Sequence, residues 1–315
     1  MLRTAFAAAI ALTLASTLAA PAARAQEAPS RAAVAPEFRL KGDTVSIPFV
    51  MVREFPFVEV QINGVKGKLM FDTGASEALA LNQNPFKLPE GRAIGRGNFA
   101  SGQSYDVILR PSVDDVRLPG GLSYDRVTTF RSQDAAQLER ITPDFLGWLG
   151  YQFWDGYAVK VDYKASKATF YKGGPKAFLK GETVIAAIPF ETPKLPNNPV
   201  LTAKIGDTDF ETVLDTGQYG NLFADKATLE QLTAAGAITP TPGEKGAIDL
   251  KAAQFAKGPA IPLAKIGSHP IEGAAPFAKA IGLTSPRIMT LGYAFLRQYK
   301  TVWDYPNKTL YLLKR

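Results

Sequence analysis

The chain of 315 residues is 46% hydrophobic and 21% charged, which is enough for two globular lobes with separate cores. It has no cysteine and one histidine, so disulfides, thiol nucleophiles and cysteine metal sites are excluded, and carboxylates are the expected chemistry of any active site. The formal net charge of +7 is mild for this length and predicts no nucleic-acid partner. The 27 glycines and 23 prolines separate short apolar runs, a pattern that favours an all-β fold.

Residues 1–25 have the pattern of a secretory signal peptide. A basic start at Arg3 precedes an apolar stretch over 5–20, and Ala23-Arg24-Ala25 offers a small-residue cleavage site. A membrane anchor is the alternative, but the stretch is short for a span and rich in alanine. We expect an exported chain, periplasmic or secreted, whose mature form has no membrane span and a net charge that falls to +5 with the loss of Arg3 and Arg24.

The next segment, residues 26–40, is predicted to be flexible because alanine and proline dominate its first part. It is much shorter than a folded inhibitory pro-segment. We therefore do not expect latency through a pro-domain.

Beyond residue 40 the chain contains one pattern twice. The offset between the copies is 139 residues at their start, 143 in the middle and 142 near their end, and a few inserted residues around 192–199 account for the first change. We predict two homologous lobes, 41–173 and 180–315, joined by a linker at 174–179. The matched segments are Lys41-Gly42-Asp43-Thr44-Val45 with Lys180-Gly181-Glu182-Thr183-Val184, Leu69–Gly74 with Thr212–Gly217, and Leu149-Gly150-Tyr151 with Leu291-Gly292-Tyr293.

Each lobe is expected to consist of strands joined by tight turns. In the first lobe the alternating segment 58–62 runs into Asn63-Gly64, which predicts a hairpin that returns over 68–71. A further hairpin is predicted at the end of each lobe, over 158–171 and over 301–312.

Helices are expected to be few and short. Leu229 and Leu232 lie three residues apart in a segment that predicts a helix over 225–235, with Gly236 as its end. Its counterpart in the first lobe is a short helix over 77–82 that Pro85 soon breaks.

The triplet Asp-Thr-Gly occurs at 72–74 and at 215–217, each time after an apolar strand and at equivalent places in the repeat. About 0.1 such triplets are expected by chance in a chain of this length. A strand with this ending presents a carboxylate from a rigid base, and the glycine allows a tight turn and a close approach. Two pseudo-symmetric lobes would place Asp72 beside Asp215, where the pair would share one proton. The ionised member could take a proton from a water while the protonated member polarises a carbonyl.

These motifs resemble those of the aspartic proteases, the pepsin and retropepsin group, over about residues 41–315. The resemblance is carried by Phe71–Ser76, by Leu214–Gly217 and by the apolar-apolar-Gly runs that end at Gly150 and Gly292. The hairpins that end in Val-Asp-Tyr and Trp-Asp-Tyr look like the bacterial retropepsin-like form. The resemblance implies two pepsin-like β-barrel lobes in one chain, so that a monomer completes the site. It also implies a peptide or protein substrate, no metal and no cofactor.

The resemblance assigns roles to residues of both loops. Asp72 and Asp215 would form the catalytic pair. Thr73 and Thr216 would brace the loops against each other. The turns and the close passage of a strand behind each loop would depend on four glycines, Gly74, Gly217, Gly150 and Gly292.

A flap hairpin would cover the cleft, and Gly95–Gly102 is the candidate because its glycines suit a mobile tip. An ordinary surface turn is the alternative for this segment. The second lobe shows no clear flap. Candidate substrate-binding residues are Ser76, Asn98, Phe99, Gln218 and Tyr219.

Two positions depart from the family pattern. Pepsin-like enzymes usually carry Ser or Thr after each triplet, but this chain has Ala75, as in retropepsins, and Gln218. Tyr219 is also bulky where the first lobe has Ser76. Fewer donors should raise the pKa values of the carboxylate pair, so we expect activity nearer roughly pH 5–7 than about pH 2.

The sequence therefore predicts an exported aspartic endopeptidase. The alternative is a catalytically silent member of the same fold that binds peptides or envelope polymers, with Gln218-Tyr219 as its mark. A non-enzymatic envelope scaffold would leave the paired triplets unexplained. We expect His269 in a surface loop, Asp162 and Asp304 in turns, and a group of aromatic residues in the cores. These aromatic residues are Tyr151, Phe153, Tyr157, Trp303 and Tyr305.

Overall fold

The computed structural model describes residues 37–98, 104–255 and 258–315. The predicted signal peptide and residues 26–36 lie outside this part of the chain. The described residues form the all-β, two-lobed architecture that the sequence predicts, with only short helices. Within the same residues, no helix is long and apolar enough to cross a membrane.

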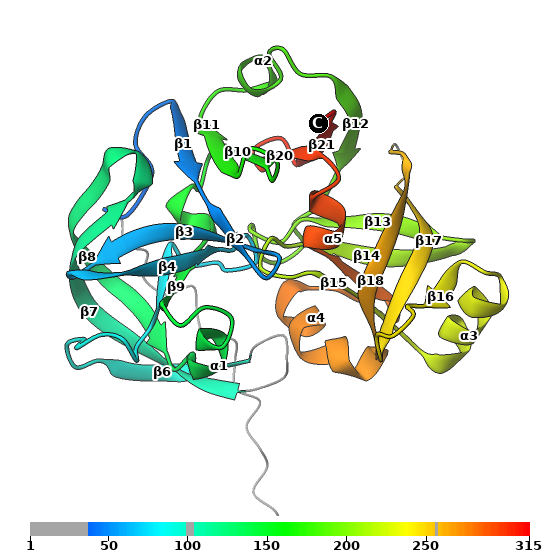
Figure 1. Ribbon diagram of the computed structural model, residues 1–315, viewed down its shortest axis with the longest axis horizontal. Helices are drawn as coiled ribbons and strands as arrows, with labels where there is room; N and C mark the ends of the chain where they lie inside the picture. The colour runs from blue at the N-terminus through cyan, green and yellow to red at the C-terminus, as the bar shows by residue number, and fades with distance from the viewer. Residues whose placement is uncertain (1–36, 99–103, 256–257) are drawn as a thin grey trace, which may run out of the picture.

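The first lobe is built around an eight-stranded sheet (Figure 1). Its order is β2-β3-β4-β9-β5-β8-β7-β6, and an additional pairing of β3 with β7 closes six of the strands into a barrel. The strands are β2 Val50–Val52, β3 Phe55–Ile62, β4 Val65–Phe71, β5 Leu79–Asn82, β6 Arg92–Asn98, β7 Ser104–Leu118, β8 Leu122–Gln133 and β9 Phe145–Leu149.

The second lobe repeats the order of the strands from β3 to β6, and only β2 has no counterpart in its described residues. Its order is β13-β14-β19-β15-β18-β17-β16, and β13 pairs with β17 as β3 pairs with β7. The internal repeat of the sequence is therefore also a repeat of the fold. The strands are β13 Val200–Ile205, β14 Thr208–Leu214, β15 Gly220–Ala224, β16 Ile238–Pro240, β17 Ala247–Phe255, β18 Ala260–Pro270 and β19 Ile288–Leu291.

A six-stranded sheet joins the two lobes and lies between them at the top of Figure 1. Its order is β1-β11-β10-β20-β21-β12, so each half of the chain supplies three strands, and β10 pairs with β20 across the middle. The two predicted C-terminal hairpins, β10–β11 and β20–β21, form the four central strands. The strands are β1 Thr44–Pro48, β10 Ala158–Asp162, β11 Lys167–Tyr171, β12 Val184–Pro189, β20 Lys300–Asp304 and β21 Thr309–Leu313.

The predicted hairpin of the first lobe is confirmed as β3–β4. Ile62 pairs with Val65, and the two residues between them have positive φ angles, 49° at Asn63 and 79° at Gly64. Asn and Gly tolerate this conformation, which matches the right-handed twist of the two strands.

Helices in the described residues are short, as expected. The predicted helix is confirmed as α3, where the carboxylate of Asp225 accepts a hydrogen bond from the Thr228 N–H at 2.7 Å and Gly236 follows with φ 63°. The helices are α1 Ala136–Glu139, α2 Pro175–Phe178, α3 Lys226–Ala234, α4 Ala275–Ile281 and α5 Tyr293–Leu296, with the single 3₁₀ turns η1 Pro119–Gly121, η2 Tyr151–Phe153 and η3 Ile271–Ala274.

The prediction of a short helix over 77–82 is wrong. Residues 79–82 form strand β5, which lies between β8 and β9 and has all four residues buried. A run this short cannot bury four successive side chains as a helix, whereas a strand inside a sheet is covered on both faces.

Two predicted connecting segments are more ordered than expected. Phe38, inside the segment 26–40 predicted to be flexible, is fully buried and packs against Tyr124 and Phe153 with ring centroids 4.7 and 4.8 Å away. That prediction is therefore wrong for its last residues. The segment 174–179, predicted as a linker, contains α2, whose Phe178 is also fully buried.

Candidate active site

Each Asp-Thr-Gly triplet begins where a barrel strand ends. β4 ends at Phe71 and lies parallel to β9, and β14 ends at Leu214 and lies parallel to β19. The hydrogen bonds between these parallel strands continue one residue further. The Asp72 N–H donates to the carbonyl of Leu149 at 3.1 Å, and the Asp215 N–H donates to the carbonyl of Leu291 at 2.9 Å. Both aspartates therefore stand on backbone that the sheet holds in place.

The two threonines connect the loops crosswise. The Thr73 N–H donates to Oγ1 of Thr216, and the Thr216 N–H donates to Oγ1 of Thr73, each at 3.0 Å. The Thr216 hydroxyl donates in turn to the carbonyl of Phe71 at 2.7 Å. Both threonines are 0% exposed, so these hydrogen bonds do not compete with water.

Each glycine of the triplets leaves room for the carboxylate of the other loop. A Cβ on Gly74 would lie 2.6 Å from Oδ2 of Asp215, and a Cβ on Gly217 would lie 2.6 Å from Oδ1 of Asp72. No real side chain fits at those distances. The glycines thus allow the two half-buried carboxylates to face each other closely enough to share a hydrogen bond.

Backbone and amide donors point at both carboxylates. Oδ1 of Asp72 accepts from the N–H groups of Gly74 at 2.8 Å and Ala75 at 3.2 Å. Asp215 accepts from the Gly217 N–H at 2.7 Å on Oδ1 and from the side-chain amide of Gln218 at 3.1 Å on Oδ2.

Despite these donors, the pKa values of both carboxyls are raised. Burial and the negative charge of Asp215 raise the pKa of Asp72 well above its usual range. Burial also raises the pKa of Asp215, while the Gly217 N–H and a hydrogen bond from Asp72 oppose the rise. Two neighbouring carboxyls with raised pKa values favour a state in which the pair shares one proton.

Strands β9 and β19 pass directly behind the two loops. A Cβ on Gly150 would lie 2.3 Å from the carbonyl oxygen of Glu77, and a Cβ on Gly292 would lie 1.8 Å from that of Gln218. These are the positions at which the sequence predicts that only glycine fits.

The candidate flap segment lies in the hairpin β6–β7, whose last described pair is Asn98 with Ser104. Phe99 and residues 100–103 lie outside the described residues. Burial and the charges of Glu77 and Asp72 raise the pKa of Tyr105, on β7, to about 12, so this side chain of the hairpin lies near the first loop. The equivalent hairpin of the second lobe, β16–β17, is much shorter.

The remaining candidate substrate-binding residues lie on the two loops. Ser76 is half-buried, and its carbonyl accepts from the Gln152 N–H at 3.3 Å. Tyr219 is half-buried as well, and its hydroxyl donates to the carbonyl of Ala264 at 3.2 Å.

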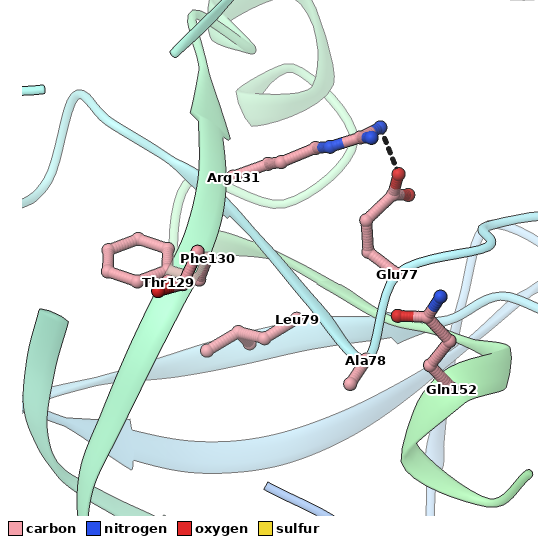
Figure 2. Close-up of a pocket in the computed structure, with 7 residues that line it drawn as sticks. All are labelled: Glu77, Ala78, Leu79, Thr129, Phe130, Arg131 and Gln152. Carbon is pink, nitrogen blue, oxygen red and sulfur yellow. Dashed lines mark hydrogen bonds and ion pairs between the residues drawn. The ribbon is translucent and has the colours of Figure 1, made fainter. Parts of the chain in front are cut away.

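Sequence reasoning missed a charged pair beside the first loop. Figure 2 shows Arg131 reaching from β8 to the carboxylate of Glu77, with Gln152 next to them. The side chains of Arg131 and Glu77 are 15% and 20% exposed. Both groups act on Tyr105 electrostatically, so the pair lies near the Tyr105 side chain of the hairpin β6–β7.

Sequence reasoning also missed Asn197. Its fully buried side-chain amide donates to the carbonyls of Thr73 at 3.3 Å and Gly74 at 2.8 Å. Asn197 lies in the inserted segment 192–199 that changes the repeat offset, and this insertion is the sequence feature that could have drawn attention to it. A residue that precedes the second barrel thus holds the first Asp-Thr-Gly loop.

Four tyrosines pack between the lobes in two symmetric pairs. Tyr151 lies edge-on against Tyr305 with centroids 4.9 Å apart, and Tyr163 lies edge-on against Tyr293 at 5.3 Å. The charge of Asp215 contributes to raising the pKa of both Tyr163 and Tyr305, so these hydroxyls lie near the carboxylate pair. The aromatic residues expected in the cores are all buried.

The other polar residues singled out by sequence have structural contacts. Asp162 and Asp304 accept backbone N–H groups of the turns that follow them, as predicted. His269 is exposed, as predicted, but it lies in strand β18 and not in a loop. The described residues contain no group of three acidic, histidine or cysteine side chains that could hold a metal.

No family model and no curated protein matches the chain. Solved structures with a similar fold include basic 7S globulin from soybean, with a TM-score of 0.51 and 10% identity over 86% of this chain and 95% of that one. They also include an aspartic proteinase from Irpex lacteus, with a TM-score of 0.52 and 13% identity over 86% of this chain and 97% of that one. One of these names denotes a proteinase and the other does not. The chain has the two-lobed fold of the pepsin-like proteins.

Proposed function

We propose that this chain is an aspartic endopeptidase that hydrolyses peptide bonds with a water held between Asp72 and Asp215. The observation that carries the proposal is the packing of each carboxylate over the glycine of the opposite triplet, 2.6 Å from where a Cβ would be. A binding module would not need two half-buried carboxyls brought this close, because keeping both ionised costs free energy. Paired acid and base catalysis does need them.

The raised pKa values suit one carboxyl to act as the general base and the other to act as the general acid. Asp215, ionised and supported by the Gly217 N–H and the Gln218 amide, takes a proton from the water. Asp72 carries the shared proton and donates it to the oxygen of the scissile carbonyl, where negative charge develops. The water oxygen bonds to the carbonyl carbon and gives a tetrahedral gem-diol. Asp215 then passes its proton to the nitrogen, the C–N bond breaks and the amine leaves, while a hydroxyl of the gem-diol returns its proton to Asp72 as the new carboxylic acid forms.

The surrounding elements fit an extended peptide substrate. The hairpin β6–β7 carries Tyr105, whose hydroxyl is under the influence of the charges of Asp72 and of the pair Glu77–Arg131. We further propose that the chain reaches the periplasm or the exterior through residues 1–25 and works as a monomer, since one chain supplies both carboxylates.

Cleavage of an unfolded protein tests this function. The wild type should produce internal fragments, and Asp72→Asn and Asp215→Asn should each lose at least about a thousandfold in kcat/KM. Asp162→Asn is the matched control, because its carboxylate caps a turn in β10–β11, and it should cleave normally. A folded wild type that cleaves nothing would support the binding-module alternative, and Gln218-Tyr219 would then be the place to examine.

A further inference from the structure

The one histidine of the chain lies at the outer end of a hydrogen-bonded row that ends on the candidate catalytic pair. Nε2 of His269 is 3.0 Å from Oδ1 of Asn221. Nδ2 of Asn221 is 3.5 Å from Oε1 of Gln218, and Nε2 of Gln218 donates to Oδ2 of Asp215 at 3.1 Å. We propose that His269 and Asn221 are positioning residues that fix the Gln218 amide so that its N–H points at Asp215.

Two parallel strands place these groups together. In β15 and β18, Asn221 pairs with Gly267 and Phe223 pairs with His269. Residues two apart share one face of a strand, so these four positions form one cluster on that face. The His269 ring stacks on Phe223 with centroids 5.2 Å apart and an interplanar angle of 30°, and it reaches across Gly267 to Asn221.

Gly267 is independent support for the row. A Cβ at this position would lie 2.3 Å from Oδ1 of Asn221 and 2.6 Å from Nε2 of His269. Its backbone has no positive φ angle, so conformation does not require glycine here. The missing side chain makes the space in which the histidine meets the asparagine.

Because the row ends at the carboxylate of Asp215, the donor and the acceptor of each hydrogen bond in it can be assigned in turn. An ionised Asp215 only accepts, so Gln218 must turn its NH₂ group toward it and its oxygen toward Asn221. Asn221 then donates from its own NH₂ group, whose second hydrogen faces Oγ1 of Thr290 at 3.4 Å. Oδ1 of Asn221 is left to accept, so Nε2 of His269 must carry a hydrogen.

At the position after the triplet, the long side chain of Gln218 takes the place of a short hydroxyl side chain as the donor to Asp215, and its orientation has to be fixed by neighbouring residues. A hydroxyl directly after the triplet would reach Asp215 from a short side chain, whereas the Gln218 amide stands on a longer side chain that can rotate and turn its oxygen inward. His269 and Asn221 remove that freedom. The consequence for catalysis rests on the proposed function: a lost donor raises the pKa of Asp215 and depletes its ionised form at low pH.

Four variants test the row in the full chain. His269→Phe keeps a ring on Phe223 but removes the donor, and Gly267→Ala places a methyl between Asn221 and His269. His269→Gln restores an N–H donor. Gly273→Ala is the matched control, because its Cβ would meet only Phe223, at 3.8 Å, in ordinary contact.

The measurement is the pKa of the Asp215 carboxyl by carbon NMR titration, with the pH profile of kcat/KM as a second readout. We expect His269→Phe and Gly267→Ala to raise this pKa, and the acid limb of the profile, by on the order of half a pH unit. His269→Gln and Gly273→Ala should leave both near the wild type. The titratable groups that face Asp215, namely Asp72, Tyr163 and Tyr305, are the same in every variant.

An unchanged pKa of Asp215 in both His269→Phe and Gly267→Ala would overturn the proposal. The NMR readout does not require cleavage, so the two proposals fail separately. A shifted pKa in a wild-type background that cleaves nothing would support the row and reject the endopeptidase. A cleaving wild type with no shift in the variants would reject the row alone.

Discussion

Single residues at the two triplets decide how the carboxylates ionise. The sequence predicts raised pKa values because Ala75 and Gln218 replace hydroxyl donors, and the structure agrees on the direction. The reason differs, since the Gln218 amide does donate to Asp215 and only Asp72 lacks a side-chain donor. Burial raises the pKa values of both carboxyls, and the charge of Asp215 adds to the rise for Asp72. The reach of a glutamine side chain depends on its rotamer, so composition alone could not foresee this bond.

Raised pKa values also make stability depend on pH. In the unfolded chain the pKa of Asp72 lies near 3.8, the ordinary value of an aspartate, whereas the folded pair still binds a proton above that pH. The folded state then binds more protons, so its free energy of unfolding falls as pH rises from 3.8 through the raised pKa. In Asp72→Asn this loss should be absent.

Denaturant unfolding of the wild type and Asp72→Asn at several pH values measures the effect. The variant should gain stability relative to the wild type as pH rises, at up to about 1.4 kcal/mol per pH unit, and the gain should stop above the folded pKa. A constant difference between the two proteins would show that the carboxyl of Asp72 titrates normally.

Asn197 should hold the first catalytic loop in place. Asn197→Ala leaves the buried carbonyls of Thr73 and Gly74 without their donor, so we expect a loss of about 1–3 kcal/mol in the free energy of unfolding and a lower kcat. Asn198→Ala is the matched control, because Asn198 is also buried, at 6% exposed, while the loop carbonyls in the described part of the chain accept from Asn197. Equal losses in the two variants, with equal kcat values, would contradict this role.

At the level of elements, strands β9 and β19 pass behind the two Asp-Thr-Gly loops and fix the position of these loops. Gly292→Ala would put a Cβ 1.8 Å from the carbonyl oxygen of Gln218, and β19 cannot move away because it pairs with both β14 and β15. We expect a loss of about 3 kcal/mol.

Gly174→Ala is the comparison for this variant. Its Cβ would meet nothing within 4 Å and its φ is −75°, so it should change stability by less than about 0.5 kcal/mol. Thermal unfolding measures both variants. A Gly292→Ala protein as stable as Gly174→Ala would mean that the loop can shift away from β19.

Elements with a local signal could be predicted, and elements that depend on tertiary contacts could not. The hairpin at Asn63-Gly64 and the helix capped by Asp225 follow from turn and cap chemistry. The sequence predicts a helix where strand β5 lies, because three apolar residues followed by Asn82 are too few to show a period, and only the pairing with β8 and β9 makes this segment a strand. Phe38 likewise follows an alanine- and proline-rich segment and is buried only because Tyr124 and Phe153 cover it.

At the scale of the whole molecule, the six-stranded sheet joins the two lobes because it contains strands from both. β10 and β20 pair across its centre, and Glu182 binds Lys160 and Lys300, one from each of these strands. Burial alone would raise the pKa of Glu182, but the hydrogen bonds from Lys300 and Lys160 have the larger combined effect, so its pKa is lowered. The hydrophobic core also contains residues of both halves in one cluster.

We therefore expect the two lobes to unfold in one cooperative transition. Calorimetry of residues 26–315 should give equal calorimetric and van't Hoff enthalpies, and Glu182→Gln should lower the single midpoint without splitting it. Two separate transitions would mean that the lobes fold independently and that the shared sheet is only a contact between them.

The pH dependence of kcat/KM tests most directly whether Asp72 and Asp215 share a proton and activate water. Cleavage of an unfolded protein would be followed from about pH 3 to about pH 8. One ionised and one protonated carboxyl predict a bell-shaped profile with its maximum between roughly pH 5 and pH 7, because both pKa values are raised. A maximum below about pH 3, or a rate that does not change across this range, would contradict the account.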